Sequence, residues 1–129
     1  MINYIMIAVG GALGSVARFG MSSLVQKSAG IGFPYGTLSV NIVGCFVIGI
    51  AAEMFEDLLI PSEWRSFVTI GFLGGFTTFS AFSLETVNLI REGESLHAIA
   101  NVALSNILGI AAVVAGVFAY RAIRKYILN

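Results

Sequence analysis

Four long apolar stretches constrain this sequence more than any other feature, because together they fill almost all of its 129 residues. They cover about residues 3–25, 36–55, 66–90 and 96–120, and a helix needs roughly 20 apolar residues to cross a bilayer. Only 11% of the residues are charged, against about a quarter in a soluble domain. The sequence therefore predicts an all-α membrane protein: a single domain, residues 1–129, of four transmembrane helices surrounded by lipid.

The composition also argues against several classes of function. One cysteine and one histidine cannot supply the four ligands of a structural zinc site. No pairing of a nucleophile with a base and no phosphate-binding loop is apparent, so we expect no enzyme, and we expect no nucleic-acid partner. The first apolar stretch has no preceding Lys or Arg and no clear cleavage motif, which predicts a retained helix and not a signal peptide.

The third stretch has an unusual centre, GFLGGFTTFSAFSLE, between Gly71 and Glu85. Its double glycine, Gly74 and Gly75, gives the backbone freedom to leave helical geometry. Non-helical backbone at membrane depth is tolerated only beside protein or a water-filled cavity, and interrupted helices form ion sites near the midplane. We therefore expect a broken third helix whose released carbonyls, around Gly74 and Thr77, suit a hard cation such as Na⁺.

Aromatic and hydroxyl side chains follow the double glycine. Phe79 and Phe82 are three residues apart and so lie close together on one helix surface, while Ser80 and Ser83 form a parallel column. Aromatic rings have a positive edge, so ring edges beside hydroxyl donors suit a small anion, although aromatic stripes in membranes are usually packing. Glu85 is either a solvated acid at the helix end or a group that gates a vestibule.

The first stretch contains a GxxxG pattern and one cation. Gly10 and Gly14 allow the backbone of another helix to approach closely, which predicts helix packing. Arg18 lies in the last third of the stretch. Its long side chain can extend to the membrane surface, or it can raise the local concentration of anions at a vestibule; both interpretations stay open.

The second and fourth stretches each carry a polar face. Thr37, Asn41 and Cys45 recur every four residues and so share one face of a helix. Asn41 either joins two helices, contributing about 1 kcal/mol, or donates its amide to an anion in a pore. In the fourth stretch small and polar residues recur at the same interval, which suits a neighbouring helix or a water path; they are Asn101, Ser105 and Gly109, with Asn106 beside Ser105.

Positive charges are almost evenly divided between the two sides of the membrane. With four crossings, both termini and the second loop share one side. That side carries Arg65, Arg121, Arg124 and Lys125, and the other carries Arg18, Lys27 and Arg91. Four against three is a weak bias for the property that normally sets orientation, so the chain can insert both ways round. Four helices are also too few to enclose a pathway, which predicts an oligomer such as an antiparallel dimer.

Three segments together carry a resemblance to a known family: GALGSVARF, YGTLSVNIVG and GFLGGFTTFSAFSLETV. The sequence resembles the Fluc (CrcB) fluoride channels of bacterial membranes over almost its whole length. The TTFSxFS string after a double glycine, downstream of a YGTLxxN helix, is specific to such channels.

The resemblance implies a dual-topology, antiparallel homodimer in the bacterial plasma (inner) membrane, through which fluoride leaves the cytoplasm passively. It implies a structural Na⁺ at the dimer interface, held by the backbone carbonyls of Gly74 and Thr77. The residues that it implies for the fluoride pathway are Asn41, Phe79, Phe82, Ser80, Ser83, Thr37, Thr86 and Ser105. Those that it implies for the vestibules are Arg18 and Glu85. In the fourth helix it assigns no role to Asn101, Asn106 or Gly109.

Two other functions compete with a fluoride channel. A proton-coupled exporter similar to the small multidrug transporters needs a carboxylate deep in its first helix, and residues 3–25 contain neither Asp nor Glu. A membrane assembly protein that transports nothing would use the glycines and polar residues only to join helices. That alternative leaves the aromatic rings beside hydroxyl groups unexplained.

Overall fold

The computed structural model describes residues 1–127, and over that range the chain contains helices and loops but no strand. The elements in chain order are α1 (Ile2–Ala29), α2 (Tyr35–Asp57), α3 (Ser62–Ser66), the π-helix η1 (Phe67–Leu73), α4 (Gly74–Phe76), α5 (Phe79–Arg91) and α6 (Ser95–Ile127). Four helical segments are long and apolar enough to cross a membrane: Ile2–Ala29, Tyr35–Asp57, Ser62–Arg91 and Ser95–Ile127. The predicted all-helical class with four such helices is confirmed.

The last helix is longer than the sequence predicts. The basic cluster after Tyr120 indicates an end near residue 120, but α6 continues to Ile127. Two of the cations are used in ion pairs with the end of α2: Arg121 lies 2.7 Å from Glu53 and Arg124 lies 3.0 Å from Asp57. Because α2 supplies these carboxylates, the charged turn of α6 has partners and does not interrupt the helix.

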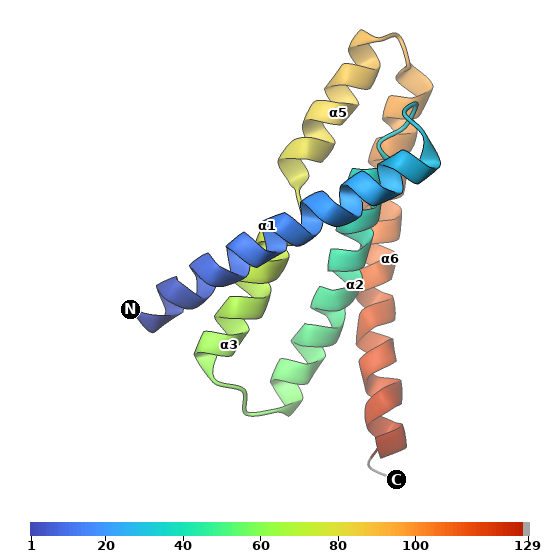
Figure 1. The fold of residues 1–129 in the computed structure, drawn as a ribbon. Coiled ribbons are helices and arrows are strands. Elements are labelled where there is room, and N and C mark those ends of the chain that lie inside the picture. The colour runs from blue at the N-terminus through green and yellow to red at the C-terminus, as the bar shows by residue number, and fades with distance from the viewer. Residues whose placement is uncertain (128–129) are drawn as a thin grey trace.

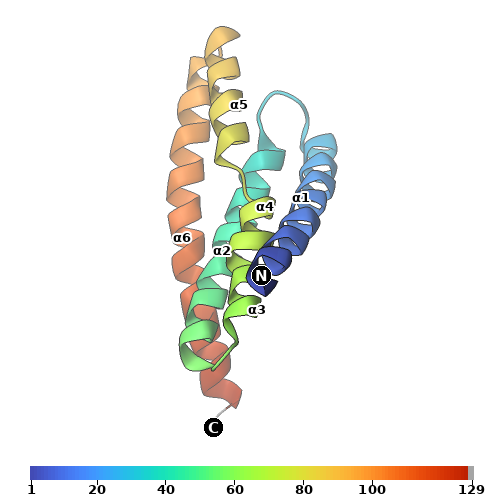
Figure 2. The same cartoon turned by 90° about the vertical axis from the view of Figure 1, so that its left-hand side faces the viewer.

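The helices pack through glycines that bring their backbones together. The most extensive packing is between α2 and α6, and α1 crosses the third segment at η1 and α4 (Figures 1 and 2). A methyl group added at Gly10 would lie 2.6 Å from the carbonyl oxygen of Phe67, and one added at Gly75 would lie 2.5 Å from that of Gly11. Only glycine fits at such distances, which is the packing typical of small residues in membrane helices.

The third segment leaves helical geometry two residues later than its glycines suggest. Gly74 has helical dihedral angles (φ −63°, ψ −36°), whereas Thr77 (φ −86°, ψ 157°) and Thr78 (φ −150°, ψ 113°) are extended. Within the break expected around Gly74 and Thr77, the extended residues are therefore Thr77 and its neighbour Thr78, and Gly74 stays helical. Gly75 serves close packing against the backbone of Gly11, and β-branched threonines, which favour extended backbone, supply the non-helical residues.

The segment beyond Thr78 forms a separate arm. α5 packs mainly against α6, beside which it runs in Figure 2, and makes few contacts with α2. The Thr78 side chain begins the helix as an N-cap, because its Oγ1 accepts a hydrogen bond from the backbone N–H of Ala81 at 3.2 Å. The position of α5 is thus set by the extended threonines at one end and by α6 along its length.

Candidate functional site

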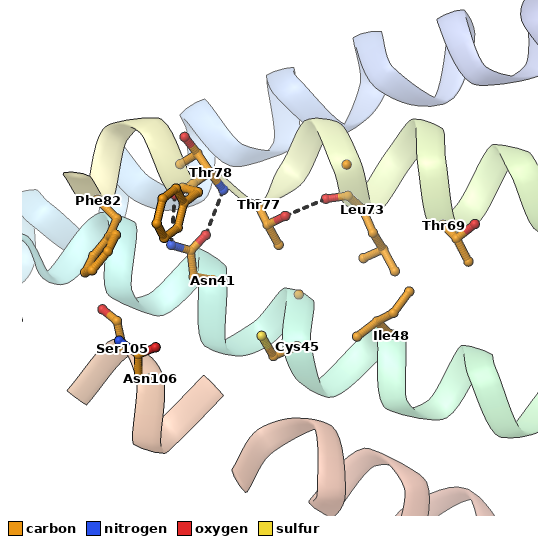
Figure 3. A pocket seen from close by; sticks show the side chains of 13 residues that line it. Asn41, Cys45, Ile48, Thr69, Leu73, Thr77, Thr78, Phe82, Ser105 and Asn106 are labelled. Atoms are coloured by element: carbon orange, nitrogen blue, oxygen red, sulfur yellow. Dashed lines mark hydrogen bonds between the residues drawn. The ribbon is translucent and has the colours of Figure 1, made fainter. Parts of the chain in front are cut away.

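Asn41 holds the extended threonines against α2. Its Nδ2 donates to the carbonyl oxygen of Thr78 at 3.1 Å, and its Oδ1 accepts from the backbone N–H of Thr78 at 2.8 Å (Figure 3). This reciprocal pair gives hydrogen-bond partners to both backbone polar groups of Thr78, a residue with extended geometry. An amide has two N–H donors, so Asn41 joins two segments and keeps one N–H for a ligand.

A pocket of about 370 Å³ opens beside the two hydrogen bonds between Asn41 and Thr78. It is lined by Asn41, Gly44, Cys45, Ile48, Thr69, Leu73, Gly74, Thr77, Thr78, Phe79, Phe82, Ser105 and Asn106. We call it the aromatic pocket, because the rings of Phe79 and Phe82 lie 5.4 Å apart at an angle of 45°. Figure 3 shows one end of the pocket, near Asn41, with Phe82, Ser105 and Asn106, and the other end with Ile48 and Thr69.

The Ser105 hydroxyl is the least satisfied polar group of the aromatic pocket. Its Oγ is buried and has no hydrogen-bond partner among residues 1–127. A buried polar group without a partner costs about 1–3 kcal/mol, so most native structures avoid one. Ser105 therefore offers a free donor next to Phe82, whose side chain is 9% exposed.

A second pocket, of about 530 Å³, lies on the other side of Thr78. We call it the basic pocket, because Arg18 lines it together with Ser15, Phe19, Ser22, Thr37, Val40, Thr78, Ser80, Ala81, Leu84 and Glu85. Thr78 lines both pockets. Arg18 is partly buried, and its Nη1 donates to the carbonyl oxygen of Thr77 at 3.4 Å. The guanidinium cation therefore lies just after α4, where the third segment becomes extended.

Glu85 is half-buried, and it lines the basic pocket. Its Oε1 accepts the hydroxyl proton of Thr37 at 2.6 Å, and its Oε2 is buried without a partner in the described part of the chain. The interpretation of Glu85 as a solvated acid is therefore wrong. The reason is the direction of α5, which turns this residue toward Thr37 of α2.

The hydroxyl groups that the sequence places in one column have different environments. Ser83 Oγ donates to the carbonyl oxygen of Phe79 at 2.9 Å, and Thr86 Oγ1 donates to that of Phe82 at 2.8 Å, so both are bonded within α5. Ser80 Oγ lies 3.3 Å from Thr78 Oγ1 and faces the basic pocket. Of the predicted pathway residues, the aromatic pocket brings together Asn41, Phe79, Phe82 and Ser105.

The carbonyl groups predicted to hold a cation are suitable in type. The backbone N–H of Thr78 donates to Asn41, whereas in a continuous helix it would bond to the carbonyl of Gly74. Gly74 and Thr77 both line the aromatic pocket, and the carbonyl oxygen of Thr77 accepts a hydrogen bond from Arg18. Across residues 1–127 no group of three His, Cys, Asp or Glu side chains could bind a metal.

Sequence reasoning did not single out Thr78, and it placed Asn101, a neighbour of the site, only on a small and polar helix face without assigning it a role. Thr78 caps α5 and separates the two pockets, and a threonine directly before an apolar helical run is the signal of an N-cap. Asn101 is 1% exposed, and its Nδ2 donates to Thr86 Oγ1 at 2.9 Å. A buried asparagine in an apolar helix indicates a bonded partner, but the partner lies 15 residues away and depends on the tertiary fold.

Comparison with known proteins covers nearly the whole chain. A sequence profile of the family described as "CrcB-like protein, Camphor Resistance (CrcB)" matches residues 5–117. The chain is 47% identical over 124 residues to a protein of Rhizobium johnstonii, covering 95% of this chain and 99% of the relative. It is 46% identical over 116 residues to one of Desulforapulum autotrophicum (89% and 93%) and 50% identical over 116 residues to one of Opitutus terrae (88% and 88%). All three relatives bear the name "Fluoride-specific ion channel FluC".

Proposed function

The chain belongs to the CrcB family, and from this membership we propose that it is a fluoride-selective channel through which fluoride leaves the cytoplasm passively. As a member of this family it is an ion channel and not an enzyme. Its four apolar helices and its relatives make it a multi-pass bacterial membrane protein. The observation that carries the proposal is the unpartnered Ser105 hydroxyl beside the two phenylalanine rings of the aromatic pocket.

The aromatic pocket has the groups that a dehydrated fluoride needs. Fluoride is small and strongly hydrated, so a selective pathway must replace its water with donors. The Ser105 hydroxyl is free to donate, the remaining N–H of Asn41 is a second donor, and the edges of Phe79 and Phe82 carry partial positive charge. None of these groups bears a full charge, which fits the requirement that a conducting site also release its ion.

The basic pocket is suited to collect anions before they reach the aromatic pocket. Arg18 attracts anions from solution by long-range electrostatics, while its bond to Thr77 keeps the cation at the side. The Ser80 hydroxyl and Thr78 lead from this pocket to the other. We place the pathway from the basic pocket, past Thr78, to the aromatic pocket.

The assembly that we propose is an antiparallel homodimer in which extended Thr77 and Thr78 interrupt the third crossing. Phe79 is 79% exposed in the single chain, which supports a second chain closing the aromatic pocket from that side. A structural Na⁺ would be held by the carbonyls of Gly74 and Thr77 of both chains. Bound there, the ion would supply a positive charge that offsets the cost of an anion at low dielectric.

The test is a halide efflux measurement on liposomes that contain the purified chain. We expect fluoride release, followed with a fluoride electrode, with chloride retained and with no pH gradient. Phe79→Ile and Phe82→Ile should strongly impair release, because the ring edges are lost. Phe118→Ile changes an exposed phenylalanine of α6 outside both pockets and should behave as the wild type.

Each alternative predicts a different result in the same liposomes. Release that requires a proton gradient would indicate a coupled exporter, and no release of any halide would favour an assembly protein. In a parallel series a large organic cation replaces Na⁺ during purification and assay. We expect slower fluoride release in that series, and unchanged release would contradict a functional Na⁺ without affecting the fluoride result.

A further inference from the structure

The most deeply buried polar side chain in the described range is Asn101, at the membrane-embedded part of α6. It is 1% exposed, against 7% for Thr37, the other buried polar residue. Burying an amide is unfavourable unless it finds a hydrogen-bond partner. Asn101 finds one on another helix: its Nδ2 donates to Thr86 Oγ1 of α5 at 2.9 Å.

Thr86 connects this bond to the aromatic pocket. A hydroxyl has one proton to donate and can accept at the same time. Thr86 Oγ1 accepts from Asn101 and donates to the carbonyl oxygen of Phe82, one turn earlier, at 2.8 Å. Two consecutive hydrogen bonds thus run from α6 to the backbone of the residue whose ring lines the pocket.

The connection matters because, in the described residues, it is one of two side-chain hydrogen bonds that join α5 to other helices, the other being that of Thr37 on α2 to Glu85. Extended Thr77 and Thr78 separate it from η1 and α4, and α5 packs mainly on α6. Within residues 1–127, the bond between Asn101 and Thr86 is the one side-chain hydrogen bond that joins α5 to α6. Rotation of α5 about its own axis would move the ring of Phe82 relative to Ser105, which lies on α6 one turn after Asn101.

We infer that Asn101 is a positioning residue for ion conduction: through Thr86 it sets the rotation of α5 and so the distance of the Phe82 ring from Ser105. Asn101 lines neither pocket, so it acts through Thr86 and not on the ion. The inference rests on the proposed function, since the property that it explains is the fluoride current of a single channel.

The test is single-channel recording of fluoride current from the full chain in planar bilayers. Asn101→Leu keeps the size and removes the donor, and Thr86→Val removes the acceptor. Hydrogen bonds between membrane helices are modest in strength, and we expect each variant to lower the current per channel roughly 3- to 10-fold. The double variant should be no worse than the more impaired single one, because residues that act through each other are not additive.

The control is Asn88→Leu, the same substitution at an exposed asparagine near the end of α5, which should leave the current unchanged. A merely structural role for Asn101 would lower the number of channels and not the current of each. Wild-type current per channel in Asn101→Leu or Thr86→Val, or additive losses in the double variant, would overturn the inference and leave the proposed function intact. Absence of fluoride current from the wild type would overturn both. Should Asn101→Leu fail to insert, Thr86→Val tests the same bond.

Discussion

Hydroxyl groups in and around the two pockets differ in whether they still have a proton to offer. Ser83 and Thr86 donate to carbonyls of their own helix, and Thr37 donates to Glu85. The Ser105 hydroxyl is buried and has no partner in the described residues. A buried hydroxyl without a partner is unfavourable for stability, which is consistent with the proposed role of Ser105 as a donor to fluoride.

Ser105→Ala separates that role from stability. Because the Ser105 Oγ makes no described hydrogen bond, its removal should leave the thermal unfolding temperature in detergent unchanged or slightly higher. Hydrogen bonds to charged groups contribute about 1.5–3 kcal/mol, so fluoride efflux should slow by at least about tenfold.

The matched control is Ser28→Ala, since the Ser28 hydroxyl donates within its own helix to Leu24 at 3.0 Å and lies outside both pockets. It should not change efflux. Normal efflux through Ser105→Ala would contradict the role given to the hydroxyl, and a loss of folding would mean that Ser105 has a structural partner after all.

Sequence patterns identify such residues more readily than they identify their bonds. The spacing of Phe79 and Phe82 predicts neighbouring rings, and their centroids are 5.4 Å apart. For Glu85 the pattern is not enough, because its partner Thr37 lies 48 positions earlier. Whether Ser80, Ser83 and Thr86 face a pocket or their own backbone depends on the direction of α5 after the extended threonines, which local sequence does not specify.

At the scale of the helices, apolar length and composition predict the class but not the interruption. The four apolar stretches correspond to four helices able to cross a membrane. The helix is interrupted at Thr77 and Thr78 and not at the double glycine. Gly75 stays in the helix, because α4 meets the backbone of α1 there and only glycine fits. A glycine in a sequence can provide either conformational freedom or room for a neighbouring backbone. Only the residues packed against it in the fold show which of the two it provides.

Adjacent glycines of α1 test this close approach. A methyl at Gly10 would lie 2.6 Å from the Phe67 carbonyl, which is backbone and cannot move aside, whereas one at Gly11 would meet its nearest atom at 3.9 Å. Gly10→Ala should lower the free energy of unfolding by about 1–3 kcal/mol through overpacking. Gly11→Ala should be neutral or slightly stabilising, because alanine favours helix over glycine.

The measurement is reversible unfolding of both variants in the same detergent, with helix content followed by circular dichroism. Equal stability of the two variants would show that α1 and η1 are not in contact as closely as this packing requires. A larger loss in Gly11→Ala would place the contact of α1 on its other face.

For the whole molecule, the distribution of charge bears on assembly. The loop between α2 and α3 and the last described turn of α6 lie at one end of the molecule, and the loops after α1 and α5 lie at the other (Figure 1). Two of the four cations of the first end, Arg121 and Arg124, are paired with Glu53 and Asp57. Orientation depends on Lys and Arg and little on acidic residues, so the count of four against three still describes the bias, and it is small. Sequence alone predicts this balance, whereas the antiparallel dimer stays a prediction.

Exposed loop positions allow the orientation to be changed without disturbing the packing. Leu59 is 103% and Ile31 98% exposed, and an added methyl at Gly32 would meet nothing within 4 Å. Leu59→Lys makes the count five against three, and Ile31→Lys with Gly32→Lys makes it four against five. A reporter fused to the C-terminus should be found on both sides of the membrane for the wild type, mainly inside for the first variant and mainly outside for the second.

Protection of cells from fluoride by these orientation variants distinguishes an antiparallel dimer from an assembly of parallel chains. A variant held in one orientation has no oppositely oriented partner, so each biased variant expressed alone should fail to protect cells from fluoride. Expressing the two variants together supplies both orientations and should restore protection, although neither carries a change in either pocket. Protection by a single variant whose reporter lies on one side only would mean that the working channel is built from chains of one orientation, and the antiparallel dimer would have to be abandoned.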